Sequence, residues 1–280
     1  MTATLSDEQR PIADGSVAPI IEARGISKRF GHLTALSDVD LRLHPGEVLG
    51  VVGDNGAGKT TLMKILSGLH PPSDGELLIN GESVRFGSPR DARRLGIEMV
   101  YQDLALAGNL RIDENIFLGR ERTRRVGPLR LVDHAASLAL ARQHLDRLRI
   151  NVKSVSQLVE DLSGGQRQAV AIARATAFDA RVVIMDEPTA ALAVKEVRKV
   201  LDLVRDLKTH GVSVILISHR LDDVFYVCDR VMALFHGRNL AEAPLAEVDR
   251  NEVIGWIMGN KRMRDEPHGR DSKPTRSVDG

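Results

Sequence analysis

Two apolar patterns divide the chain and predict an α/β fold. Residues 48–52, 182–185 and 212–217 are short, almost unbroken apolar runs, which is typical of strands buried on both faces of a sheet. Residues 39–43 instead alternate apolar and polar side chains and are followed by a Pro-Gly turn. That alternation predicts half-buried strands near the N-terminus, ahead of the main sheet.

The middle of the chain changes to a helical period. Leu138, Ala141 and Leu145 recur at steps of three and four residues, and Asp133 stands before them as an N-cap. We therefore expect a small helical subdomain over about residues 103–178.

Arginines are concentrated just before this helix. They are Arg120, Arg122, Arg124, Arg125 and Arg130. We expect a solvated loop here, and contact with lipid headgroups or a partner is the alternative. Nucleic acid is not expected, because the aromatic side chains on which bases stack are missing.

Composition and charge add few constraints. Lys and Arg number 39 against 38 Asp and Glu in 280 residues, so no overall field favours nucleic acid or an acidic partner. The single Cys228 excludes an internal disulfide and fits a reducing compartment. No run approaches the roughly 18 apolar residues of a membrane span, and we expect no secretory signal. Residues 1–18 and 261–280 are polar and aperiodic, so a disordered leader and tail should flank one domain at 19–260.

A phosphate-binding pattern follows the first buried strand. Residues 53–60 read GDNGAGKT, which satisfies G-x-x-x-x-G-K-[ST] between a strand and an apolar helix pattern. Such glycines let backbone N–H groups turn toward a triphosphate, and the helix N-terminus adds its dipole. We expect Lys59 to reach the outer phosphates and Thr60 to offer its hydroxyl to Mg²⁺. The expected ATP contacts of this loop are Gly53, Asp54, Asn55, Gly56, Ala57, Gly58, Lys59, Thr60 and Thr61.

Four polar residues come at or just after the ends of apolar runs. They are Gln102, Asp186, Glu187 and His219. In an open α/β sheet, ligands bind beyond the carboxyl ends of the strands. We predict that Asp186 holds the Mg²⁺ shell, directly or through water, and that Glu187 orients or deprotonates an attacking water. Gln102 is placed to face the nucleotide, and His219 is a candidate phosphate contact.

A second glycine-rich helix start reads LSGGQ. Ser163 and Gln166 have the spacing of a capping box. A cap does not require Gly164 and Gly165, which leave the helix N-terminus bare so that an anion can approach the backbone amides closely.

Phe30 precedes the first glycine of the phosphate loop by 23 residues, in a chain with only 3% aromatic residues. An exposed aromatic at this distance suggests a contact with the nucleotide. An ordinary core phenylalanine explains the residue equally well, and the pattern leaves both interpretations open.

Taken in order, these motifs resemble the nucleotide-binding subunit of ATP-binding-cassette (ABC) transporters, over about residues 19–260. GDNGAGKT resembles the family's phosphate loop, YQD its Q-loop, LSGGQ its signature, VVIMDEP its Mg²⁺ and base strand, and ISH its histidine switch. The resemblance implies a P-loop NTPase cassette with a RecA-like core, a small antiparallel β-subdomain and an inserted helical subdomain. It also implies that Phe30 stacks on adenine, that Gln102 senses the metal and the attacking water, and that His219 contacts the γ-phosphate.

The resemblance further implies ATP hydrolysis with Mg²⁺, in a pair of cassettes. The implied catalytic residues are Lys59, Gln102, Glu187 and His219, and the implied metal site is Thr60, Gln102 and Asp186. The implied signature, which closes over ATP held by a second copy of the cassette, is Ser163, Gly164, Gly165 and Gln166. The wording of the motifs is similar to importers of ribose, xylose and fructose, most of all to single-cassette fructose-type subunits. The implied partners are transmembrane permease subunits and, indirectly, a substrate-binding protein, at the cytoplasmic face of the inner membrane.

One position departs from the family pattern. The chain has Ala193 where the family usually has an aspartate that helps communication across the dimer. We expect hydrolysis to survive, because Glu187 and His219 are present. The alternatives are an exporter subunit, a non-hydrolysing regulatory cassette, suggested only by Ala193, and a soluble ABC ATPase acting on DNA or ribosomes. The last is disfavoured because only about 60 residues separate Gln102 from Ser163, without sustained heptads.

Overall fold

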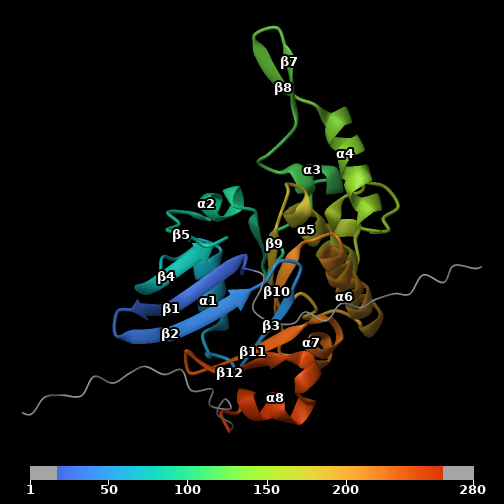
Figure 1. Cartoon of the computed structure of the whole chain (residues 1–280). Coiled ribbons are helices and arrows are strands. Elements are labelled where there is room, and N and C mark those ends of the chain that lie inside the picture. Colours follow the sequence, from blue (N-terminus) through green and yellow to red (C-terminus); the bar gives the residue numbers. More distant parts are fainter. Residues whose placement is uncertain (1–17, 261–280) are drawn as a thin grey trace, which may run out of the picture.

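The computed structural model describes residues 18–260, which form a main sheet, a smaller antiparallel sheet and a projecting hairpin (Figure 1). The main sheet has the order β12-β11-β3-β10-β9-β6, and β12 alone runs antiparallel to its neighbour. Its strands are β3 (Val48–Val52), β6 (Ile97–Val100), β9 (Val182–Asp186), β10 (Ser213–Ile217), β11 (Arg230–Phe235) and β12 (Arg238–Pro244). The leader predicted at residues 1–18, apart from residue 18, and the tail predicted at residues 261–280 lie outside the described residues.

Helices cover both faces of the main sheet. They are α1 (Lys59–Leu66), α2 (Pro89–Arg94), α3 (Ile112–Phe117), α4 (His134–Arg147), α5 (Gly164–Thr176), α6 (Val194–Thr209), α7 (Leu221–Val227) and α8 (Arg250–Ile257). Alternate residues of β10 belong to different cores, since Ile215 and Ile217 join the cluster that includes α1, whereas Val214 and Leu216 join the one that includes α5 and α6. A strand covered on both faces needs an apolar residue at nearly every position, which confirms the prediction from the unbroken runs.

The smaller sheet lies over the other side of α1. Its order is β2-β1-β4-β5, with β1 (Ile21–Phe30), β2 (Leu33–Leu43), β4 (Asp74–Ile79) and β5 (Glu82–Val84). Ile21 faces Leu43 and Ala23 faces Leu41 across the β1–β2 ladder, and all four side chains are buried in the same core cluster as α1. The half-buried strands predicted for this region are confirmed.

The inserted region contains α3, α4, the short 3₁₀ helix η1 (Val159–Asp161) and α5, together with an element that the sequence did not predict. Strands β7 (Thr123–Val126) and β8 (Leu129–Val132) form a two-stranded hairpin, which stands away from the sheets in Figure 1. The prediction that the arginines occupy a loop was therefore wrong for Arg124, Arg125 and Arg130. Thr123, Arg124 and Arg125 of β7 and all four residues of β8 are exposed, so these positions are under no requirement to be apolar.

The last elements form a third core cluster around Trp256 of α8, against β11, β12 and α7. Within residues 18–260, no helix is both long and apolar enough to cross a membrane.

Candidate functional site

The phosphate loop connects β3 to α1, and two of its glycines cannot be replaced without a clash. Gly53 has a φ of 149°, and a Cβ there would lie 2.3 Å from the carbonyl oxygen of Leu234. Gly58, the N-cap of α1, has a φ of 101°, and a Cβ there would lie 2.6 Å from Cδ2 of Leu36. The tight packing around the loop therefore explains why these two positions are glycine.

Lys59 opens α1 and its side chain folds back over the loop. Its Nζ donates to the carbonyl oxygens of Gly53 at 2.7 Å and Asp54 at 3.0 Å. Burial lowers the pKa of Lys59, while the nearby carboxylates of Glu187 and Asp186 act in the opposite direction. The ammonium group thus lies between the loop and the carboxyl end of β9, where the phosphates of a bound nucleotide would need a cation.

Asp186 ends β9 next to α1. Burial raises the pKa of its carboxyl, and the charge of Glu187 adds to this effect. Lys59 and a hydrogen bond with Thr60 oppose it. A carboxylate and a hydroxyl in hydrogen-bonding contact are oxygen donors of the kind that Mg²⁺ prefers, and a divalent cation would offset the cost of burying Asp186. The residues present therefore fit a Mg²⁺ site.

Glu187 takes a left-handed backbone conformation with a φ of 49°. This conformation is unfavourable for a residue with a side chain, and a hydrogen bond from its N–H to the carbonyl oxygen of Ile217 at 3.0 Å holds it. The bend brings Oε2 of Glu187 to 3.1 Å from Nδ1 of His219. Glu187 and His219, predicted independently from two strand ends, are thus in direct contact.

A buried hydrogen-bond network supports these two strand ends, and sequence analysis missed it. The hydroxyl of Thr189 donates to Asp223 of α7, which also accepts from the hydroxyl of Ser218 at 3.5 Å. All three residues are buried. Thr189 follows Glu187 and Ser218 precedes His219, so Asp223 connects the two loops that carry the candidate catalytic pair. No pattern around Asp223 indicated this role.

Phe30, at the end of β1, has 43% of its surface exposed. The alternative that it is a core phenylalanine is therefore wrong. Its ring contacts His70 edge-on at 5.6 Å between centroids, and Nζ of Lys28 lies 5.1 Å from the ring centre. The exposed ring is free to pack against a planar ligand.

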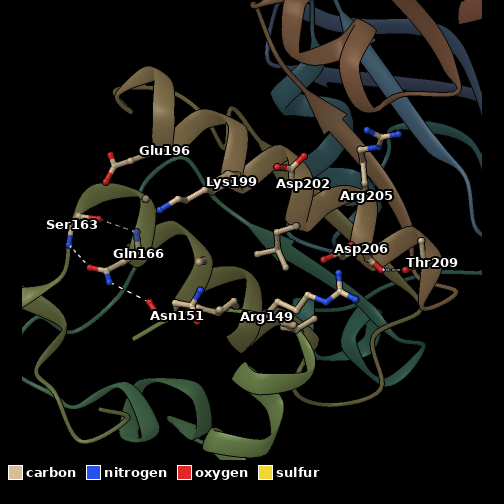
Figure 2. A pocket seen from close by; sticks show the side chains of 16 residues that line it. Arg149, Asn151, Ser163, Gln166, Glu196, Lys199, Asp202, Arg205, Asp206 and Thr209 are labelled. Carbon is tan, nitrogen blue, oxygen red and sulfur yellow. Dashed lines mark hydrogen bonds between the residues drawn. The ribbon is translucent and has the colours of Figure 1, made fainter. Parts of the chain in front are cut away.

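The start of α5 has the predicted capping box. Gln166 N–H donates to Oγ of Ser163 at 3.3 Å, and Ser163 N–H donates to the Gln166 side chain at 3.1 Å. These residues line a cavity of about 890 Å³ between α5 and α6 (Figure 2), and no residue of the phosphate loop lines it. The signature residues are therefore not brought together with Lys59 in a single closed site.

Glu196 of α6 lies against the bare glycines, which sequence analysis did not foresee. A Cβ on Gly165 would lie 2.8 Å from Cβ of Glu196, and the carboxylate appears beside Ser163 in Figure 2. The hydroxyl of Ser163, and then the N–H groups of Gly165 and Ala193, lie close enough to the Glu196 carboxylate to lower its pKa. A carboxylate of the same chain thus lies beside donors that the sequence assigned to a phosphate. Its only sequence signal is its place in the first turn of α6.

Gln102 follows β6 and lines a groove of about 430 Å³. Leu104, Leu106 and Arg167 line the same groove. The loop beyond it is fixed by Arg174 of α5, which donates to the carbonyl oxygens of Leu104 and Ala105 at 2.7 Å each. Gln102 is therefore tied through this loop to the helix that begins at the signature.

The comparisons with known proteins agree on the family. A model of the ABC transporter family matches residues 36–190. The chain is 46% identical over 248 residues to the fructose import ATP-binding protein FrcA of Rhizobium meliloti, covering 87% of this chain and 95% of that one. It is 44% identical over 237 residues to the xylose/arabinose import ATP-binding protein XylG of Sulfolobus acidocaldarius, covering 85% and 93%.

Two further comparisons bear on length and fold. The ribose import ATP-binding protein RbsA 3 of Rubrobacter xylanophilus is 46% identical over 243 residues, and the chain spans only 48% of its length. Among solved structures, a dimeric ATP-binding cassette in a post-hydrolysis state with ADP and Pi has a TM-score of 0.67 at 26% identity, covering 80% of this chain and 98% of that one. The cassette cbiO1 of Clostridium perfringens has a TM-score of 0.72 at 26% identity, covering 85% and 93%.

The fold is that of an ATP-binding cassette, and the candidate site lies at the carboxyl ends of its strands β3, β9 and β10. The chain belongs to the ABC transporter family, and it is an ABC-type ATPase. The resemblance deduced from the motifs and the predicted fold class are confirmed.

Proposed function

We propose that the chain is the ATP-hydrolysing subunit of a membrane importer for a simple sugar. Relatives whose names describe fructose and xylose or arabinose import are 44–46% identical to it, and the chain covers at least 93% of each of the two. The exporter subunit and the soluble ATPase acting on DNA or ribosomes have no comparable support. The proposed cassette spans residues 19–260, with the helical subdomain over about residues 103–178.

In this proposal the phosphate loop and Lys59 bind the triphosphate, while Phe30 stacks on adenine. Thr60, Asp186 and Gln102 would hold Mg²⁺, which would supply positive charge to neutralise the transferred phosphoryl group. The carboxylate of Glu187 takes the proton from the attacking water. His219 keeps Glu187 in place through the 3.1 Å contact and reaches toward the γ-phosphate.

The signature completes the site from a second copy. Ser163 and the N–H groups of Gly164 and Gly165, with Gln166, would donate to the phosphate held by the partner cassette. Closure of two cassettes on ATP would drive attached permease subunits, and hydrolysis would reopen them. The cassette would lie peripherally at the cytoplasmic face of the inner membrane and would depend only indirectly on a substrate-binding protein.

The single observation that carries the ATPase proposal for this site is the contact between Glu187 and His219 beside Lys59. The test of the transport role is a pull-down of the tagged chain from detergent-solubilised membranes, with the co-purified proteins identified by mass spectrometry. We expect a hydrophobic subunit with several membrane spans. Recovery of ribosomes, nucleic acid or soluble proteins alone would overturn the importer proposal and leave the ATPase.

Ala193 provides a separate test of the catalytic assignment. It is the N-cap residue of α6 and has no side-chain acceptor for this role. We propose that the chain hydrolyses ATP although it has Ala193 where the family usually has an aspartate, because none of the proposed catalytic groups is missing. In the reconstituted complex, turnover should clearly exceed that of a Glu187→Gln variant. Turnover equal to that of the variant would instead support a regulatory cassette.

A further inference from the structure

The β7–β8 hairpin is the one element of the described region whose strands pair only with each other. It follows α3 and precedes α4, and in Figure 1 it projects beyond the helical region. An isolated two-stranded hairpin is at best marginally stable in water. A hairpin in this position therefore gains stability from any surface that it meets.

The register of the hairpin separates its side chains onto two faces. Residues directly opposite each other in an antiparallel ladder share a face, and successive residues alternate. Leu129 and Leu131 consequently lie on one face together with Arg124, which is paired with Leu131. Leu129 is 62% exposed and Leu131 is 46% exposed. This face presents two large apolar side chains to solvent, beside the guanidinium group of Arg124.

The opposite face carries a pair of like charges. Arg125 lies directly opposite Arg130. Like charges in this position destabilise a ladder unless an anion lies between or beside them. Arg120, just before the hairpin, is neutralised by Glu98 at 2.7 Å, but within residues 18–260 the structure gives Arg124, Arg125 and Arg130 no ion pair. The sequence from 122 to 132 contains no Asp or Glu.

We propose that this hairpin is a membrane-contact element that binds anionic phospholipid. The hairpin enters the headgroup region with its turn leading, so that both faces meet lipid. Arg125 and Arg130 take the lipid phosphate between them on one face, Leu129 and Leu131 enter on the other, and Arg124 lies at the boundary. Arginine forms paired hydrogen bonds with phosphate oxygens, and basic groups are attracted to an anionic leaflet. The proposal is independent of the sugar, because it concerns only how the cassette meets the membrane.

The chemistry of the hairpin favours lipid over other partners. Residues 118–133 contain no aromatic side chain on which a nucleic acid base could stack. A leaflet offers both an apolar layer, against which exposed leucines can pack, and a layer of anionic headgroups, which arginines can bind. A protein partner with an acidic, apolar surface is the alternative that stands if the chain binds neither kind of vesicle in the test.

The test is cosedimentation of the purified full chain with phosphatidylcholine vesicles, with and without phosphatidylglycerol, at low and at high salt. We expect binding only to vesicles that contain phosphatidylglycerol, and weaker binding at high salt. The variant R124Q/R125Q/R130Q should bind about a hundredfold more weakly, since each basic group contributes roughly fivefold at such a surface. The variant L129S/L131S should also bind more weakly but keep the salt dependence.

The matched control is R85Q/R90Q/R147Q, which removes the same charge from exposed arginines outside the hairpin. It should bind like the unmodified chain. Thermal stabilisation by ATP should be the same in every variant, which separates this proposal from the proposed ATP site. The proposal is overturned if the unmodified chain binds neither vesicle, if the hairpin variants bind as it does, or if the control loses as much binding as R124Q/R125Q/R130Q.

Discussion

Nδ1 of His219 lies 3.1 Å from Oε2 of Glu187, at the ends of the neighbouring parallel strands β10 and β9. Glu187→Gln keeps the shape of the side chain but removes the base. We expect ATP turnover to fall by about 10² to 10⁴-fold. ATP binding, followed by thermal stabilisation, should be retained. A variant that loses ATP binding together with turnover would contradict the assignment of Glu187 as the base.

The contact of Glu196 with the start of α5 leads to a second prediction, which rests on the proposed role of the signature. The Glu196 carboxylate lies beside the donor groups of Ser163 and Gly165, which lower its pKa, and a phosphate from the partner cassette would need the same donors. Glu196→Gln weakens this internal competition. We test this in a Glu187→Gln background, which prevents hydrolysis. There we expect the Glu196→Gln variant to dimerise at about a tenfold lower ATP concentration than the chain with Glu196, because the charge that competes with the phosphate for these donors is removed.

The control for Glu196 is Glu252→Gln in α8. Glu252 also lies in the first turn of its helix and accepts from the N–H of Asp249 at 3.1 Å, so the variant weakens an equivalent cap away from the signature. Light scattering across an ATP titration measures the dimer. If the Glu196 variant dimerises at an unchanged or higher ATP concentration, the Glu196 carboxylate only caps the start of α6.

Phe30 and Phe117 provide a contrasting pair. Phe30 is 43% exposed, whereas Phe117 is 3% exposed in the core against α4 and α5. Phe30→Ala should weaken ATP binding about 10-fold or more through lost stacking and leave the free energy of unfolding nearly unchanged. Phe117→Ala should lower that free energy by about 3–5 kcal/mol. Calorimetric titration and urea unfolding measure the two effects, and unchanged ATP affinity in Phe30→Ala would argue against stacking.

We expect the thiol of Cys228 to react at different rates in the folded and the unfolded chain. Its Sγ lies 3.0 Å from where a Cβ on Gly50 would be, and burial raises its pKa well above the usual value of a thiol. At mildly alkaline pH the folded protein should therefore hold the thiol protonated, and a disulfide reagent should react slowly. Reaction should become fast in urea, where the pKa returns to its usual value. Equally fast reaction in the native protein would show that the sulfur is accessible.

Features that depend on neighbouring residues could be predicted from the sequence. The unbroken runs predicted β3, β9 and β10 because a strand covered on both faces requires apolar residues throughout. The capping box at Ser163 and the N-cap at Asp133 were predictable for the same reason, since each involves residues only three positions apart. The order of motifs was sufficient to indicate an ABC cassette.

Other features were decided by packing between distant segments. The side chains described for the β7–β8 hairpin are exposed, and its strands are only four residues long, so the sequence did not distinguish it from a solvated loop. Phe30 could be placed at the surface only once the smaller sheet and α1 had defined which side of β1 is covered. Asp223 reaches Thr189, and Glu196 reaches Gly165, because α7 and α6 pack beside segments more than 30 positions away in sequence. The sequence by itself determined the strands, the caps and the class of chemistry, whereas the tertiary structure decided which carboxylates and arginines meet, since those contacts depend on how helices and sheets pack in space.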